Sequence, residues 1–318
     1  MQDKFGRTID YMRISITDRC NLRCVYCMAE EQQQFLPESE LLTIEEWERL
    51  CQGAAQAGIR KIRITGGEPL MRPDVVSLVH KISQIPNIEK VVMTSNGVGL
   101  AKVAKKLKLA GLAGVNISID SLERESYCRL TGRDVLAEAL EGLSACGSVG
   151  LPVKVNCVPV VGENEAALWQ LAELAKQYPI EVRFIEMMPL GEGAKFQPIA
   201  NDKILQQFQE RYGDFVQQEP DKKDGPAIYY QNAAFCGSIG LISPMSHSFC
   251  HQCNRIRVTA DGKLKLCLHH PADLDLRALL RAGNQAEQIK TILQEAVQQK
   301  PKDGHSTDES RPMWRIGG

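Results

Sequence analysis

Six strand-like segments, most of them followed by a helix-like stretch, recur over the first two-thirds of the chain and constrain its fold more than any other feature. We predict these strands at residues 12–16, 61–65, 91–95, 115–119, 153–157 and 182–187. Helical patterns at 44–57 and 165–178 lie between them, and Thr43 with Glu46 forms a capping box before the first. This alternation favours parallel strands joined by crossover helices. Either an open barrel or a doubly wound sheet satisfies it.

The predicted strands alternate between apolar and polar residues, whereas buried parallel strands are normally apolar throughout. The second strand, for example, reads Lys61, Ile62, Arg63, Ile64 and Thr65. Each strand therefore has one apolar face, which packs on helices, and one polar face. An exposed polar sheet face is the alternative, but crossover helices usually cover the outside. We therefore expect a wet, cationic barrel interior with contributions from Arg13, Lys61, Arg63, Lys154 and Arg183.

The sequence predicts an α/β fold in which residues 1–216 form an open, partial parallel (β/α)6 barrel related to the TIM barrel. The pattern changes after residues 189–191. A helix near 202–212 and a charged linker at 217–225 come first, followed by short strand-like segments and helices at 276–281 and 286–299. We interpret residues 217–318 as a smaller α+β C-terminal domain.

Eleven cysteines are many for a chain without a recognisable secretory segment, because cytosolic disulfides are rare. Cys51 and Cys146 each belong to the apolar stripe of a different helical segment and are interpreted as core residues, while Cys236 falls in a loop and has no assigned role. Cys128 and Cys157 are also scattered, and the other six cysteines fall in two tight groups, formed by Cys20, Cys24 and Cys27 and by Cys250, Cys253 and Cys267. Three thiolates can hold an iron–sulfur cluster with one open iron, or a zinc ion with a fourth ligand elsewhere.

The first cysteine group resembles the signature of the radical S-adenosylmethionine (SAM) superfamily. It reads C-x-x-x-C-x-x-C with Tyr26 before the last cysteine, and the sequence TGGEP follows the second strand at 65–69. The second group has C-x-x-C followed, after thirteen intervening residues, by one cysteine. Within the superfamily this pattern is similar to the GTP 3',8-cyclases of molybdenum cofactor biosynthesis. Further matching segments lie at 3–7, 13–19, 183–186, 240–244, 254–257, 276–281 and 316–318.

This resemblance implies the cofactors, the substrate and the residues that contact them. Both cysteine groups would hold a [4Fe–4S] cluster, and the first would cleave SAM to start conversion of GTP to (8S)-3',8-cyclo-7,8-dihydroguanosine 5'-triphosphate. The implied SAM contacts are Tyr26, Gly67, Ser118 and Met188, with Met187 an alternative to Met188. The implied GTP contacts are Arg13, Arg63, Thr94, Lys154, Arg255, Ile256 and Arg257. Supporting roles fall to Arg183, Gly317 and Gly318, and we expect the terminal glycines to thread into the barrel, where Arg13, Arg63 or Arg183 could meet the terminal carboxylate.

The resemblance also implies a one-electron donor of the flavodoxin or ferredoxin type, a downstream cyclic pyranopterin monophosphate synthase and a homodimer. With a net charge of -1 and a pI of about 6.6, the chain has no overall electrostatic attraction to nucleic acid or to a membrane surface. With no membrane-spanning apolar run and no signal-peptide core, we expect a cytoplasmic protein with neither partner. Two alternatives stay open at this stage: a radical SAM peptide-modifying enzyme with an auxiliary cluster, and a zinc-stabilised binding protein without catalysis.

Overall fold

One twelve-stranded sheet runs through both halves of the chain, in the order β12-β11-β10-β1-β2-β3-β4-β5-β6-β9-β8-β7. The computed structural model describes residues 1–28, 34–219, 225–272, 274–304 and 313–317. The strands are β1 (Tyr11–Ser15), β2 (Lys61–Thr65), β3 (Lys90–Ser95), β4 (Gly114–Ser118), β5 (Val153–Cys157), β6 (Glu181–Ile185), β7 (Val216–Gln217), β8 (Ile228–Gln231), β9 (Ser238–Ile242), β10 (Arg255–Val258), β11 (Lys263–Lys265) and β12 (Leu274–Asp275).

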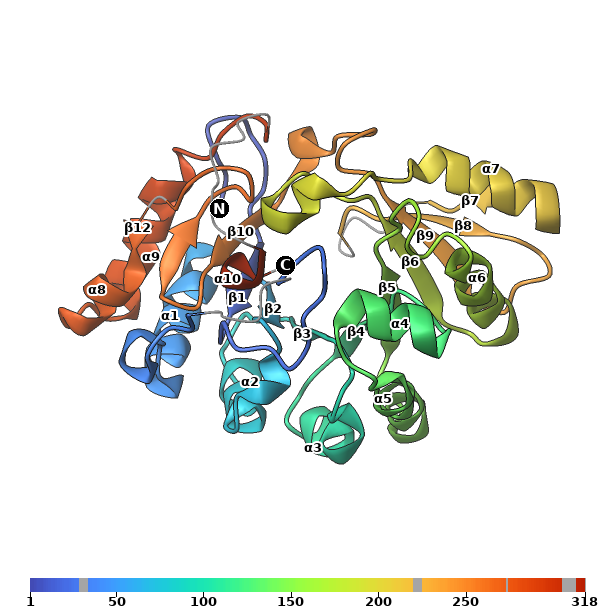
Figure 1. The fold of residues 1–318 in the computed structure, drawn as a ribbon. Coiled ribbons are helices and arrows are strands. Elements are labelled where there is room, and N and C mark those ends of the chain that lie inside the picture. Colours follow the sequence, from blue (N-terminus) through green and yellow to red (C-terminus); the bar gives the residue numbers. More distant parts are fainter. Residues whose placement is uncertain (29–33, 220–224, 273, 305–312, 318) are drawn as a thin grey trace.

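Helices follow most of the barrel strands and lie around the outside of the sheet (Figure 1). They are α1 (Ile44–Ala57), α2 (Val75–Ser83), α3 (Ala104–Leu109), α4 (Arg124–Thr131), α5 (Leu136–Val149), α6 (Ala167–Gln177), α7 (Asn201–Tyr212), α8 (Leu276–Arg281), α9 (Ala286–Val297) and α10 (Met313–Ile316). The capping box predicted for α1 is confirmed, since Thr43 Oγ1 accepts from Glu46 N and Glu46 Oε2 accepts from Thr43 N. Consecutive strands β1 to β6 are parallel, which confirms the predicted (β/α)6 core.

The predicted division of each strand into an apolar and a polar face is also confirmed. Ile62, Ile64 and their counterparts on neighbouring strands belong to one buried core cluster beneath the helices. The opposite faces of the strands carry the polar side chains, and these line the concave side of the sheet. Because the outer helices cover the apolar face of the sheet, the polar face of each strand points into the barrel. The inside of the barrel is therefore the polar compartment.

The C-terminal part of the chain extends the same sheet on both sides instead of forming a sheet of its own. Strand β9 pairs in parallel with β6, and β10 pairs in parallel with β1. A (β/α)6 sheet leaves unpaired backbone groups along both edge strands, and these two strands satisfy them. The remaining strands add antiparallel at both ends, and among the described residues β12 and β7 do not pair to close the barrel.

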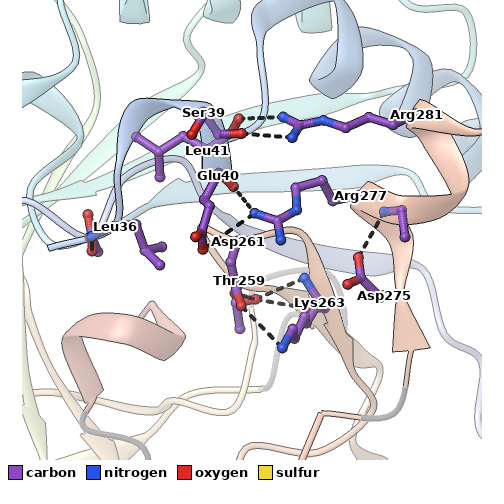
Figure 2. A network of polar contacts seen from close by, with 12 residues as sticks. Leu36, Ser39, Glu40, Leu41, Thr259, Asp261, Lys263, Asp275, Arg277 and Arg281 are labelled. Atoms are coloured by element: carbon purple, nitrogen blue, oxygen red, sulfur yellow. Dashed lines mark hydrogen bonds and ion pairs between the residues drawn. The ribbon is translucent and has the colours of Figure 1, made fainter.

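Helix α8 joins the C-terminal part to the segment that precedes α1 (Figure 2). Arg277 Nη1 donates to the carbonyl of Glu40 at 2.7 Å, and Arg281 Nη1 donates to the carbonyl of Ser39 at 2.7 Å. Arg281 also pairs with Glu46 in the first turn of α1, with 2.8 Å between Nε and Oε1. These contacts, together with the packing of α9 on α1, hold the two halves of the chain against each other.

We expect Arg277→Ala to lower the free energy of unfolding by about 1–3 kcal/mol, because the substitution leaves a charge-assisted hydrogen bond unmade in a largely buried place. The Arg277 side chain is only 19% exposed. Denaturant unfolding measures the effect. Lys290→Ala is the control, since it removes an exposed ion pair within α9 and should change stability by under about 0.5 kcal/mol. Equal losses in the two variants would contradict the role assigned to Arg277.

Candidate active site

Both cysteine groups line one cavity of about 400 Å³ inside the barrel. The first group follows β1, at the carboxyl-terminal ends of the parallel strands, where the catalytic residues of such barrels gather, and the second lies near the start of β10. Most of the residues predicted from the sequence are in its wall: Cys20, Cys24, Cys27, Cys250, Cys253, Cys267, Tyr26, Gly67, Ser118, Met188, Arg13, Arg63, Thr94, Arg183, Arg255 and Arg257. Met187 lines it as well, so the structure does not choose between the two methionines.

The first cysteine group lies in the loop that leaves β1. Cys27 N and Met28 N both donate to the carbonyl of Cys24, so the chain turns tightly between the last two cysteines. All three thiols are free. Burial raises the pKa of Cys20 to about 11 and that of Cys27 to about 12, because a thiolate is poorly solvated here without a cation. Three thiols directed at one space, each needing positive charge to ionise, suit a cluster of iron ions.

The TGGEP segment after β2 packs against this loop. A Cβ atom on Gly67 would lie 2.4 Å from the carbonyl oxygen of Arg19, so only glycine fits at this approach. Glu68 is buried, and its two oxygens accept from Leu70 N, Ser95 Oγ and Asn96 N at 2.7 to 3.0 Å. Glu68 also lines the cavity, and its oxygens fix the end of β3 beside the cysteines.

A pair that the sequence analysis did not single out joins the first group to β4. The Tyr26 hydroxyl donates to Asp120 Oδ2, and Val158 N donates to Asp120 Oδ1 at 2.8 Å. Burial raises the pKa of Asp120 to about 6. The signal was present, because Asp120 continues the polar face of the fourth strand one step beyond Ser118. Asp120 therefore holds the Tyr26 ring against the cavity.

Three arginines form an in-register row across three neighbouring strands. Arg13 on β1 lies opposite Arg257 on β10 and Arg63 on β2, so the three Cα positions are about 4.8 Å apart from strand to strand. Burial and the charge of Arg257 lower the pKa of Arg13 well below its usual range. Burial raises the pKa of Tyr11 in the row beneath, but Arg63, Arg13 and Lys61 outweigh it and lower that pKa to about 7. This concentration of positive charge favours an anionic ligand.

Three of the residues expected in the barrel interior or at GTP lie outside the cavity lining. Lys61 and Lys154 lie on the inward faces of their strands, but two residues nearer the amino-terminal ends than the lining residues Arg63 and Asn156, and they are outside the lining. Lys61 packs on the Tyr11 ring at 5.0 Å, and Lys154 Nζ lies 2.5 Å from Glu181 Oε2. Ile256 falls between two inward-facing arginines, so strand alternation places its side chain in the core.

The C-terminal tail enters the barrel. Arg257 Nη1 donates to the carbonyl of Gly317 at 3.0 Å, and a Cβ atom on Gly317 would lie 2.6 Å from Thr65 Oγ1. The expected pairing of the terminal carboxylate with Arg13, Arg63 or Arg183 falls on Gly318, which lies outside the described residues. At the other end of α10, the backbone N–H of Trp314 donates to the sulfur of Cys27. The tail thus contacts the surroundings of both cysteine groups.

The second cysteine group lies beside β10 and β11, next to the arginine row. Cys250 begins a short 3-10 helix (Cys250–Gln252), Cys253 precedes β10, and Cys267 follows β11. Burial raises the pKa of Cys253, but the positive charges of Arg255 and Lys300 outweigh burial and lower it to about 7. The described residues contain no group of three or more His, Cys, Asp or Glu side chains gathered for a single ion. A cubane cluster spaces its cysteine sulfurs more widely than one ion does, and three free thiols per group are a suitable donor set for it.

Comparison with known proteins identifies the family to which the chain belongs. The model of the radical SAM superfamily matches residues 14–175, and the model described as Molybdenum Cofactor Synthesis C matches residues 180–306. Over its whole length the chain is 42% identical to the GTP 3',8-cyclase of Pelotomaculum thermopropionicum and 39% identical to that of Clostridium perfringens, with 100% of each chain covered. The chain belongs to the GTP 3',8-cyclase family.

Solved structures agree on the fold of this GTP 3',8-cyclase family member. Streptococcus suis SuiB bound to its precursor peptide SuiA superposes with a TM-score of 0.62 at 12% identity, covering 92% of this chain and 67% of that one. SuiB bound to S-adenosylmethionine gives a TM-score of 0.59 at 13% identity, covering 89% and 68%. Membership in the radical SAM superfamily supports SAM and one [4Fe–4S] cluster as cofactors. Within the described residues, every helix is too short or too polar to cross a bilayer.

Proposed function

We propose that this chain is a GTP 3',8-cyclase, which joins C3' of the ribose to C8 of the guanine in GTP and makes (8S)-3',8-cyclo-7,8-dihydroguanosine 5'-triphosphate. The observation that carries this proposal is the arrangement of the cavity. A three-cysteine site after β1, a second three-cysteine site near the start of β10 and a row of arginines between them face the same 400 Å³ space. A radical source and a triphosphate ligand would share that space.

The cysteines divide between two cofactor sites in this proposal. Cys20, Cys24 and Cys27 would hold the cluster that binds SAM, and Cys250, Cys253 and Cys267 would hold a second [4Fe–4S] cluster. When bound, the first cluster and SAM supply the radical chemistry. Tyr26, Gly67, Ser118 and one of the two methionines would line the SAM site, and the Asp120 contact would keep Tyr26 in place.

The arginine row would bind and orient the triphosphate. Guanidinium groups form paired, charge-assisted hydrogen bonds with phosphate oxygens, so Arg257, Arg13 and Arg63 could each take part. Thr94 already accepts from Arg63 at 3.2 Å and would hold that side chain in place. A contact from Lys154 would require its ion pair with Glu181 to open. Arg183 donates to Asn156 Oδ1 at 2.9 Å and would support the far side of the site.

Two partners and an assembly belong to the same proposal. Turnover needs electrons, so a one-electron donor of the flavodoxin or ferredoxin type would reduce the clusters. The cyclised nucleotide would pass to a cyclic pyranopterin monophosphate synthase, in agreement with the molybdenum cofactor description of the C-terminal family model. A homodimer is part of the proposal on the family resemblance alone.

Anaerobic incubation with GTP, SAM and dithionite, followed by mass spectrometry and NMR of the product, tests the function. We expect the cyclised nucleotide, and Arg13→Ala should weaken GTP binding by about 10- to 100-fold, since one charged hydrogen-bonding group is worth about 1.5–3 kcal/mol. Arg124→Ala, which removes an exposed arginine, is the control and should bind GTP normally. Zinc in place of iron, or consumption of SAM with GTP recovered unchanged, would overturn the proposal.

A further inference from the structure

Two buried cations from opposite ends of the chain reach the second cysteine group, and neither was assigned a role above. Arg7 is 8% exposed and Lys300 is 2% exposed. A buried charge is costly unless it is paired or fully hydrogen-bonded, so each of these side chains calls for a specific explanation.

Arg7 is presented by a tightly ordered N-terminal loop. Asp3 Oδ1 accepts from Phe5 N and Arg7 N at 2.9 Å, and Asp3 Oδ2 pairs with Arg7 Nε at 2.6 Å. The guanidinium then donates to three carbonyls, those of Cys250 at 2.8 Å, Pro301 at 2.6 Å and Lys302 at 2.9 Å. One planar group therefore ties the first cysteine of the second site to the segment that follows α9.

Lys300 makes the complementary contacts from that same segment. Its ammonium donates to the carbonyl of Arg255 at 2.8 Å, and also to the carbonyl of Leu266. Arg255 is two residues after Cys253, and Leu266 immediately precedes Cys267. Lys300 itself lines the cavity beside all three cysteines. The segment continues along the site, since a Cβ atom on Gly304 would lie 3.7 Å from Cys267 Sγ.

We propose that Arg7 and Lys300 are positioning residues that brace the second cluster site. Between them they hold a backbone carbonyl in each of the three stretches that carry Cys250, Cys253 and Cys267, and they join all three to residues 300–302. Asp3 neutralises Arg7, and Lys300 lies in the same cavity wall as Cys253 and Cys267. Lys300 therefore also supplies a fixed positive charge to the second cluster. This inference rests on the proposed second cluster.

Matched variants separate geometry from charge. Arg7→Lys keeps the charge but loses the fork that reaches three carbonyls, and Lys300→Met keeps the length but loses both donors and the charge. Lys300→Arg keeps the charge. Lys290→Met, at a partly exposed lysine on α9 that pairs with Glu287, is the control.

The readouts are iron content and the separate EPR-monitored reduction potentials of the two clusters. Arg7→Lys and Lys300→Met should lose up to the four irons of the second cluster, about half of the total, and keep the first. In the Lys300→Met protein that retains its iron, the reduction potential of the second cluster should shift negative, because positive charge favours the reduced cluster. Lys300→Arg should restore that potential. The reduction potential of the first cluster should stay constant in both variants. Equal loss of both clusters would indicate a merely structural role and overturn the proposal, as would full iron with unchanged potentials. Wild-type protein with only four irons would instead refute the second cluster itself.

Discussion

Cys24→Ala should reduce the iron content of the reconstituted protein from about eight to about four per chain and abolish reductive cleavage of SAM. Cys24 is the middle ligand of the first group, and its carbonyl organises the turn that carries Cys27. Without its sulfur only two thiols remain to hold a cluster that must already leave one iron open for SAM. Iron analysis and detection of the cleaved nucleoside by chromatography measure the two effects.

The control for that experiment is Cys236→Ala. Cys236 is an exposed cysteine in a loop after β8, away from the cavity lining, and its removal tests whether loss of any thiol disturbs reconstitution. We expect full iron and normal SAM cleavage from the control. SAM cleavage by the Cys24 variant at the wild-type rate would show that the first group does not hold the radical source.

Local sequence pattern was sufficient to predict the barrel, because the order of apolar and polar residues within each strand indicates which of its faces is buried. Alternation within Lys61–Thr65 separates a core face from an interior face without any knowledge of neighbouring strands, and β2 and β5 have the predicted bounds. The cysteine groups could also be recognised locally, since the first spans 8 residues and the second 18. The arginines could be placed inside the barrel individually, but their row depends on strand register, which follows from long-range pairing.

The contacts that were missed join residues far apart in the sequence. Arg7 and Cys250 are 243 residues apart, and Lys300 and Arg255 are 45 residues apart. Lys300 has no local signature, because a lone lysine after an amphipathic helix is normally solvated. The alternation of apolar and polar residues placed Lys154 on the correct face of its strand. It could not give the position of the side chain along the barrel axis, and so could not reveal the ion pair with Glu181 or that this lysine is outside the cavity lining.

Gly317→Ala should reduce formation of the cyclised product by about 30-fold or more while leaving both clusters loaded. Gly317 has a φ of 83°, in the left-handed region, and an added Cβ would lie 2.6 Å from Thr65 Oγ1 and 2.8 Å from Ser15 Cβ. Backbone strain of about 1 kcal/mol and overpacking of about 1–3 kcal/mol would act together against the seated tail. Because every 1.4 kcal/mol is a tenfold change in population, the tail would mostly leave the arginine row.

The control separates strain from the clash inside the barrel. Gly99 has a φ of 78° and no atom within 4 Å of an added Cβ, so Gly99→Ala carries the strain alone and should turn over normally. Deleting both terminal glycines should reproduce the Gly317→Ala defect. The deletion removes the carbonyl that Arg257 contacts, and the substitution displaces it. If Gly317→Ala makes product at the wild-type rate, Arg257 serves the triphosphate without help from the tail. If product is lost together with iron, the tail is needed to hold the clusters, in keeping with the Trp314 contact to Cys27.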